Sequence, residues 1–263
     1  MRPSRILKEA RAGKVATIAK INIPHPAVID LCGLAGLSGV WLCNEHGPND
    51  WSLIDHCVRA GKEHDLDIIV RIAKGSYSDY IKPFEADAAG IMVPHVTSAE
   101  EAEWVVDHCR CHPVGNRPID GGNADGRYCQ HEAAEYLRHC NEEKLILLQI
   151  ESREGAAAVD AIAAVPGYDG LVFGPGDFTH RLGKFGQTND PEVVEARARV
   201  EAAMQKHGKF GFAVGLPDGP DALRERGYGC VCVVSDVISL GASLREAREH
   251  FEGGGSAPSI YDK

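Results

Sequence analysis

Leu147-Leu148-Gln149-Ile150-Glu151 and Leu171-Val172-Phe173-Gly174-Pro175-Gly176-Asp177 are two apolar segments that each end in a carboxylate. A charge is costly in the middle of a buried strand, so we expect Glu151 and Asp177 where their strands leave the core. The segments lie about one strand-and-helix unit apart, which suggests neighbouring parallel strands. Carboxylates at two such ends could hold one hard divalent cation, Mg²⁺, Mn²⁺ or Co²⁺. The alternative is that each carboxylate only caps the following helix.

The composition is that of an ordinary globular protein, with 263 residues, 44% hydrophobic and 25% charged. A formal net charge of −10 argues against nucleic-acid and anionic-membrane partners. A small anionic substrate remains compatible, because a metal ion and a few local arginines outweigh a diffuse surface charge. We expect no signal peptide and no membrane span. The nine irregularly spaced cysteines suggest free thiols and a cytoplasmic location.

Strand patterns alternate with helix patterns along the chain. The expected strands are 15–23, 39–44, 67–72, 90–96, 145–151, 170–174, 210–215 and 230–235. The expected helices are 26–37, 49–63 with Asn49 as a possible cap, 78–86, 98–109, 130–141, 154–165, 191–207, 220–226 and 240–251. Two polar segments, 112–127 and 179–189, are expected to be loops, and we expect the first to shape a substrate pocket.

This order predicts an α/β protein with a single (β/α)8 TIM barrel over residues 1–252 and a flexible tail at 253–263. The rival fold is a doubly wound open sheet. That fold usually carries a glycine-rich phosphate-binding turn after its first strand, and residues 21–24 contain no such turn.

In a barrel of parallel strands, the C-terminal strand ends share one mouth, where catalytic side chains gather. His46 ends the second expected strand beside Glu45 and could act as a general base, although most histidines in a chain are structural. Arg71 could steady the oxygen of a developing enolate or form a salt bridge at the rim. Lys74 raises the alternative of a Schiff base. The backbone N–H groups near Gly176 could bind a substrate carboxylate.

These segments resemble a known family, the HpcH/HpaI aldolases, which are class II, metal-dependent pyruvate aldolases. The resemblance covers nearly all of residues 4–250. It rests on Trp41-Leu42-Cys43-Asn44-Glu45-His46-Gly47-Pro48-Asn49, Gly90-Ile91-Met92-Val93-Pro94, Ser98-Ala99-Glu100-Glu101-Ala102, Gln149-Ile150-Glu151 and the segment 169–177.

The resemblance implies a (β/α)8 barrel whose last helix packs on a neighbouring subunit, in trimers or hexamers. It also implies a role for each residue of the site. The implied roles are Glu151 and Asp177 as metal ligands, His46 as the base supported by Glu45, Arg71 on the keto or enolate oxygen, Gln149 near the substrate, and the backbone at Gly176 and Asp177 on its carboxylate.

The chain departs from the family pattern at three positions. Cys43 stands where the family usually has an aspartate that supports the base, so the imidazole should be less basic and less firmly oriented. Arg117 is followed by Pro118, where the family tends to have glycine. Gly176 replaces a common alanine, which is a mild change.

The resulting hypothesis is an enzyme that cleaves a 4-hydroxy-2-keto acid to pyruvate and an aldehyde, or joins the two. A decarboxylase acting on oxaloacetate-like acids is the first alternative, because it needs the base less. A non-catalytic barrel that binds a small acid is the second alternative, and it differs from both enzymes by lacking turnover.

Overall fold

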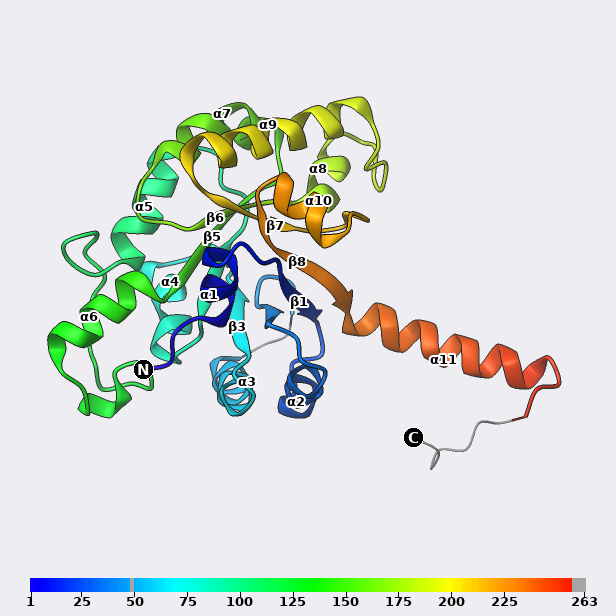
Figure 1. Cartoon of the computed structure of the whole chain (residues 1–263), viewed down its shortest axis with the longest axis horizontal. Coiled ribbons are helices and arrows are strands. Elements are labelled where there is room, and N and C mark those ends of the chain that lie inside the picture. Colours follow the sequence, from blue (N-terminus) through cyan, green and yellow to red (C-terminus); the bar gives the residue numbers. More distant parts are fainter. Residues whose placement is uncertain (48–49, 257–263) are drawn as a thin grey trace.

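The barrel predicted from the strand pattern is present in the computed structural model, which describes residues 1–47 and 50–256. Parallel strands form one closed barrel in chain order, from β1 to β8 (Figure 1). The strands are β1 Ala16–Ile21, β2 Gly39–Cys43, β3 Asp67–Arg71, β4 Gly90–Val93, β5 Leu145–Ile150, β6 Gly170–Phe173, β7 Phe210–Ala213 and β8 Tyr228–Ser235. The fold is therefore the expected (β/α)8 TIM barrel.

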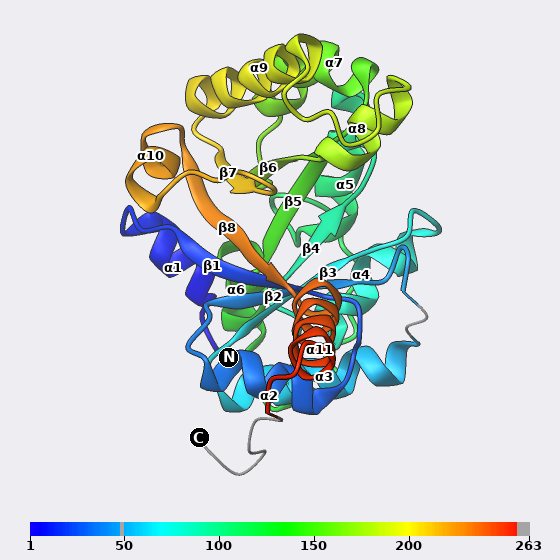
Figure 2. The same cartoon turned by 90° about the vertical axis from the view of Figure 1, so that its right-hand side faces the viewer.

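Helices surround the strands (Figures 1 and 2). They are α1 Arg5–Arg11, α2 Pro26–Leu34, α3 Trp51–Glu63, α4 Tyr77–Glu85, α5 Ala99–Cys109, α6 Ala133–Glu142, α7 Arg153–Ala164, α8 Pro175–Arg181, α9 Pro191–His207, α10 Pro220–Glu225 and α11 Asp236–Glu252, with a 3₁₀ turn η1 at Arg127–Cys129. None of the helices within the described residues is long and apolar enough to cross a membrane.

Two apolar layers hold the barrel together. Inward-facing residues of alternate strand positions fill the interior with large side chains such as Trp41, Met92 and Phe212. The larger outer layer lies between the strands and the helices. This double burial explains why the strands read as continuous apolar runs in the sequence.

The structure corrects several element boundaries. The expected strand 15–23 ends at Ile21, and the expected loop 179–189 begins inside α8. Helix α3 is capped by Asp50, whose carboxylate accepts a hydrogen bond from Leu53 N at 2.8 Å. Asn49, the cap expected from the sequence, and residues 257–263 of the expected tail lie outside the described residues.

Helix α1 was not expected, and it closes the N-terminal end of the barrel. Its Ile6 and Leu7 are buried in the interior layer. The fully buried Asp67, at the start of β3, accepts hydrogen bonds from Ser4 Oγ at 2.6 Å and from Ile6 N at 2.9 Å. Arg2 Nη2 lies 2.6 Å from the second oxygen of the same carboxylate.

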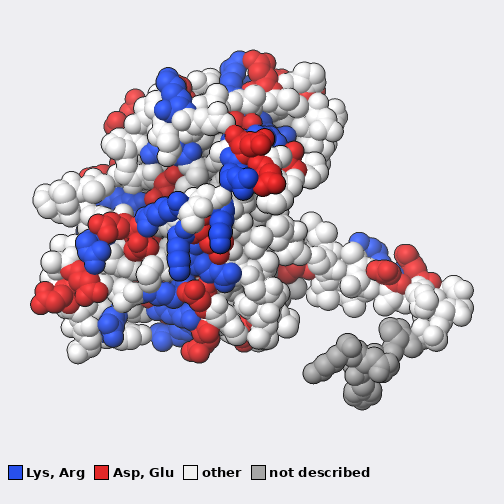
Figure 3. Space-filling view, viewed as in Figure 1, with Lys and Arg blue, Asp and Glu red and all other residues white. Residues whose placement is uncertain are grey.

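Helix α11 projects away from the barrel, and we refer to it as the arm (Figures 1 and 2). It touches the barrel chiefly at β1 and β8, and none of its 17 residues is buried. The uncharged stretch 237–244 forms its first half, and Figure 3 shows charged side chains gathered toward the far end. The arm therefore exposes an apolar surface within a single chain.

Replacing Asp67 by alanine should destabilise the fold by about 3 kcal/mol, because it leaves buried donors without their acceptor. Urea unfolding followed by circular dichroism measures this loss. Asp65→Ala is the matched control, since Asp65 also pairs with Arg2 but its side chain is 67% exposed. The control should cost only about 0.5 kcal/mol, and equal losses for both variants would contradict the anchoring role of Asp67.

Candidate active site and metal centre

Three side chains meet at the C-terminal end of the barrel strands. Glu151 follows β5, Asp177 lies in the first turn of α8 after β6, and His95 follows β4. One ligand atom from each of these residues lies within 4.8 Å of the others. The structure thus brings the two carboxylates together as the sequence indicated, and it adds a histidine to them.

Glu151 is buried, with 1% of its surface exposed, and both of its carboxylate oxygens accept hydrogen bonds. Its Oε2 accepts a hydrogen bond from Gln149 Nε2 at 2.6 Å, and its Oε1 accepts one from His95 N at 2.8 Å. Gly174 packs directly against this pair, because a Cβ atom there would lie 2.6 Å from Glu151 Oε2 and 2.7 Å from Gln149 Nε2. A glycine is therefore required at this position for the carboxylate to keep its place.

The burial of Glu151 raises the pKa of its carboxyl group to about 8, and the nearby negative charges of Asp177 and Glu45 act in the same direction. The hydrogen bond from His95 N and the charge of Arg71 only partly oppose this rise in pKa. A divalent cation would supply the missing positive charge, and two carboxylates with an imidazole suit Mg²⁺, Mn²⁺ or Co²⁺. The donor set therefore fits a metal ion.

Arg71 is the last residue of β3, at the C-terminal end of the barrel, and is 4% exposed. Its Nη2 donates to Cys43 Sγ at 3.1 Å, and its Cζ lies 4.9 Å from the centre of the Trp41 ring. Its Nε is 3.0 Å from Glu45 Oε2, but the two atoms are not aligned as a hydrogen bond. Both therefore remain buried without a hydrogen-bond partner among the described residues, as does Gln149 Oε1, which is typical of atoms that bind a ligand.

Two histidines contact Glu45, and they differ in burial. His46 is 59% exposed at its side chain, and its Nε2 lies 3.6 Å from Glu45 Oε2. His95 Nε2 lies 3.3 Å from Glu45 Oε1, and His95 Nδ1 lies 2.9 Å from Glu151 Oε1. Desolvation lowers the pKa of His95. The negative charge of Glu45 raises this pKa, and the positive charge of Arg181 lowers it further, so the net shift is downward. His95 thus lies between the two glutamates.

His95 adopts a left-handed backbone conformation, with φ 51°. Such a conformation is unusual for a residue with a side chain and often marks a functional position. The sequence signal for this residue was its place two positions after the apolar strand β4.

Lys74 is removed from the centre of the site. Its ammonium donates to the His95 carbonyl oxygen at 2.6 Å and forms an ion pair with Glu101. Both acceptors draw the ammonium away from Glu151 and Asp177, so the geometry gives little support to a Schiff-base role.

The first helical turn of α8 carries Gly176 and Asp177. The first N–H groups of a helix have no partner within the helix, so these two remain available to an anion. A Cβ atom built at Gly176 would meet nothing within 4 Å, so this position does not need a glycine for packing.

The loop 112–127 corrects one expectation. It connects the end of α5 to α6 and the start of β5, which places it at the N-terminal end of the barrel. Arg117 and Asp125 form a buried ion pair there at 2.9 Å, and Tyr136 donates to Asp125 at 2.8 Å. Within the chain the loop therefore does not shape the mouth, because it follows a helix rather than a strand.

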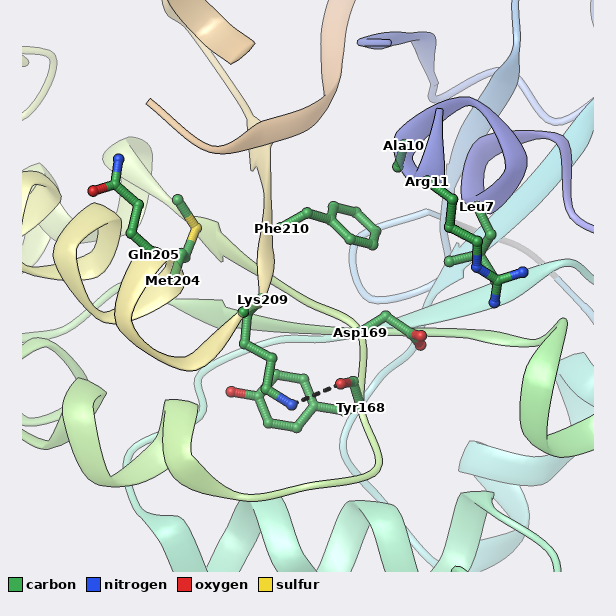
Figure 4. A pocket seen from close by; sticks show the side chains of 10 residues that line it. Leu7, Ala10, Arg11, Tyr168, Asp169, Met204, Gln205, Lys209 and Phe210 are labelled. Carbon is green, nitrogen blue, oxygen red and sulfur yellow. Dashed lines mark hydrogen bonds between the residues drawn. The ribbon is translucent and has the colours of Figure 1, made fainter. Parts of the chain in front are cut away.

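A pocket of about 470 Å³ also opens at the N-terminal end, between α1 and the starts of β6 and β7 (Figure 4). Lys209 donates there to the carbonyl oxygens of Tyr168 at 2.8 Å and Val165 at 2.9 Å. These bonds join the connections that enter β6 and β7, so the lysine has a structural role, as is usual at this end of a barrel.

A closed parallel barrel with carboxylates at its C-terminal strand ends is the architecture of a TIM-barrel enzyme. Residues 21–241 match the family model described as HpcH/HpaI aldolase/citrate lyase. The chain belongs to this family, and it is therefore an enzyme of the aldolase and carbon–carbon lyase class. The family assignment favours an enzyme over the non-catalytic barrel.

Named relatives and solved structures agree with this assignment. A hydroxypyruvate/pyruvate aldolase of Pseudomonas aeruginosa is 32% identical over 97% of this chain and 96% of its own length. A 5-keto-4-deoxy-D-glucarate aldolase of Klebsiella pneumoniae is 31% identical over 88% of this chain and 90% of its own. The crystal structure of an HpcH/HpaI aldolase from Desulfitobacterium hafniense superimposes with a TM-score of 0.87 and 26% identity, covering 97% and 98% of the two chains.

The raised pKa of Glu151 makes the stability of the metal-free protein depend on pH. Between the ordinary glutamate pKa of 4.5 and about 8, the unfolded chain is ionised while the folded protein keeps the proton. Stability should therefore fall as pH rises through this window, and Glu151→Gln should remove much of the fall. Urea unfolding in the presence of a chelator, from pH 5 to 8, measures the effect.

The exposed Glu103 of α5 provides the control for this measurement. Glu103→Gln should follow the wild-type pH profile. Profiles of Glu151→Gln and wild type that run parallel would show that the Glu151 carboxyl does not titrate in this range.

Proposed function

We propose that this enzyme cleaves the C3–C4 bond of a 4-hydroxy-2-keto acid to give pyruvate and an aldehyde, with Mg²⁺, Mn²⁺ or Co²⁺ as its cofactor. The single observation that carries the proposal is the convergence of Glu151 and Asp177 beside the buried Arg71. The named relatives support the choice of pyruvate as a product, since their names describe pyruvate and keto-sugar-acid aldolases.

Glu151 and Asp177 would hold the metal ion, and His95 offers a third donor beside them. A divalent cation at this position would bind a 2-keto acid and stabilise negative charge on its oxygen. Gln149 and the first N–H groups of α8, at Gly176 and Asp177, lie on the same side of the mouth and suit the substrate carboxylate.

The remaining steps use side chains of this chain. His46 takes the proton of the C4 hydroxyl, with Glu45 orienting the imidazole. As the C3–C4 bond breaks, C4 and its oxygen become the aldehyde carbonyl and the electron pair remains on the pyruvate fragment as an enolate. Arg71 donates to the enolate oxygen at C2. Protonation at C3 then completes pyruvate, and the reverse order joins pyruvate to an aldehyde.

Cys43 gives a specific reason to keep the decarboxylase as a second candidate. Its sulfur accepts a hydrogen bond from Arg71 at 3.1 Å, where the family pattern has an aspartate. A thiol does not supply the charge of a carboxylate, so among the described residues the support of the imidazole rests on Glu45. Loss of CO₂ from an oxaloacetate-like acid uses the same enolate stabilisation and does not require a base on a C4 hydroxyl.

A screen of 2-keto acids for pyruvate release, with each metal ion added in turn, tests the proposal. We expect turnover of a 4-hydroxy-2-keto acid, loss of activity with a chelator, and loss of both metal binding and activity in Glu151→Gln. His46→Ala should lower kcat by about 10²–10⁴-fold. His95→Ala separates the two histidines, since a larger effect there would move the base to His95.

Other outcomes assign the site differently. Turnover of oxaloacetate alone would favour the decarboxylase. Activity that survives chelation, together with covalent trapping by borohydride at Lys74, would contradict the metal-dependent mechanism.

We also propose a homo-oligomer, a trimer or a hexamer, in which the arm packs on a neighbouring subunit. The arm exposes Ile238 at 70% and Leu244 at 63%, which an isolated chain would not favour. On α2, Leu31 and Leu34 are exposed as well, at 65% and 75%, and they offer an apolar surface of the kind the arm needs. The free cysteines accord with the cytoplasm as the location.

The double variant Ile238→Glu and Leu244→Glu should dissociate the oligomer, because it places charges in the buried interface. Size-exclusion chromatography with light scattering measures the mass in solution. Arg248→Ala, a change near the charged far end of the arm, should leave the mass unaltered. A monomeric wild type would contradict the proposed assembly.

A further inference from the structure

The two ring nitrogens of His95 face different groups. Arg181 Nη2 lies 3.3 Å from His95 Nδ1 and donates a hydrogen bond to it. A guanidinium group can only donate, so this contact requires an unprotonated Nδ1 that carries a lone pair. The proton of the neutral imidazole is then on Nε2, which lies 3.3 Å from Glu45 Oε1. The contacts of the two nitrogens therefore favour the same tautomer.

The unprotonated Nδ1 of His95 lies beside the two carboxylates. It is 2.9 Å from Glu151 Oε1, and one ligand atom each of His95, Glu151 and Asp177 lies within 4.8 Å of the others. A nitrogen lone pair and a carboxylate oxygen at this distance repel each other unless a proton or a cation joins them. Neighbouring ligands of an octahedral ion, each at about 2.1 Å from it, are about 3 Å apart. The separation of the two atoms therefore suits two ligands of one ion.

The backbone of His95 is fixed at its N–H and at its carbonyl group. The N–H donates to Glu151 Oε1 at 2.8 Å, and the carbonyl oxygen accepts a hydrogen bond from Lys74 Nζ at 2.6 Å. These two bonds hold the left-handed conformation, with φ 51°. The imidazole is thereby directed to the same carboxylate oxygen that the N–H of its own residue contacts.

Glu45 contacts the second ring nitrogen of His95. A metal-bound histidine usually donates its other ring N–H to a carboxylate, which orients the ring and makes the coordinating nitrogen more basic. Glu45 Oε1 lies at this position beside His95 Nε2. Its Oε2 lies near Arg71 Nε at 3.0 Å and near His46 Nε2 at 3.6 Å. Glu45 can therefore orient His95 through one oxygen and keep its other contacts through the second.

We propose that His95 Nδ1 is the third protein ligand of the metal ion and that Glu45 is a positioning residue, which acts on the ion through His95. The inference rests on the metal dependence in the proposed function and narrows the choice of ion. An imidazole nitrogen favours the later divalent transition metals, whereas Mg²⁺ prefers a shell of oxygens alone. Co²⁺ should therefore bind more tightly than Mn²⁺, and Mn²⁺ more tightly than Mg²⁺.

Calorimetric titration with CoCl₂ and with MgCl₂, in the absence of substrate, tests the ligand. His95→Asn should raise the Kd for Co²⁺ by about tenfold or more, and the Kd for Mg²⁺ by less than about threefold. Asparagine tolerates the left-handed conformation, so this variant keeps the backbone contact with Glu151 and removes only the imidazole. Glu45→Gln should also weaken Co²⁺ binding by about tenfold, and Glu151→Gln should abolish it.

Arg181 gives an independent test, because it competes with the ion for the lone pair of His95 Nδ1. It is the last residue of α8 and is exposed. Arg181→Leu should tighten Co²⁺ binding several-fold in the wild type, through the loss of both a competitor and a nearby positive charge. In the His95→Asn background only the effect of the charge remains, so the gain should be smaller. Equal gains in the two backgrounds would overturn the ligand role of His95.

His46→Gln is the matched control for metal affinity, because His46 also contacts Glu45 but its side chain is 59% exposed. It should leave the Kd for Co²⁺ unchanged. Proton NMR of the Co²⁺-loaded protein gives a direct readout of the ligand. Coordination through Nδ1 leaves a proton on His95 Nε2, which should give one strongly shifted resonance that is lost in D₂O. The same resonance in His95→Asn would overturn the proposal, as would a wild-type spectrum without it.

The failure of the proposed function has a different signature. A protein that binds Co²⁺ through Glu151 and His95 but turns over no 2-keto acid supports the ligand and overturns only the aldolase. An active aldolase in which His95→Asn weakens Co²⁺ and Mg²⁺ equally, or weakens neither, keeps its function and overturns the ligand role of His95. A wild type that binds neither ion overturns both proposals.

Discussion

The arrangement of the mouth depends on one buried carboxylate, that of Glu151. Gln149 and the backbone of His95 hold its two oxygens, and Gly174 leaves room for them. These contacts join the ends of β4, β5 and β6, which are three consecutive strands of the barrel. The same burial that fixes the carboxylate also makes its charge unfavourable in the absence of a cation. The burial of Glu151 therefore explains both the fixed position of its carboxylate and the need for a positive charge beside it.

The two ends of the barrel have separate tasks. At the N-terminal end, α1 fills the interior and Asp67 fixes its first residues, while Lys209 joins the connections that enter β6 and β7. At the C-terminal end, Arg71 Nε and Gln149 Oε1 have no hydrogen-bond partner within residues 1–47 and 50–256. The N-terminal end supplies rigidity through the packing of α1 and the hydrogen bonds of Asp67 and Lys209, and the C-terminal end keeps donors and acceptors available.

Much of this fold could be predicted from the sequence, because strands buried on both faces are recognisable as short apolar runs. Glu151 and Asp177 were recognisable for the same reason, since each ends such a run. The proximity of His95 to both glutamates depends on a left-handed backbone conformation that no sequence pattern specifies. Helix α1 was missed because its short apolar segment, Ile6 and Leu7, is explained only by the N-terminal end of the barrel that it fills, which the sequence pattern does not reveal.

The two glycines that flank Pro175 set different limits on redesign of the enzyme. Gly174 tolerates no side chain, because a Cβ atom would displace Glu151 and Gln149, whereas Gly176 borders open space. Engineering of substrate range by randomised libraries can therefore include Gly176 but should exclude Gly174. Variation at the second glycine would alter the shape of the entrance without moving the carboxylate on which the chemistry relies.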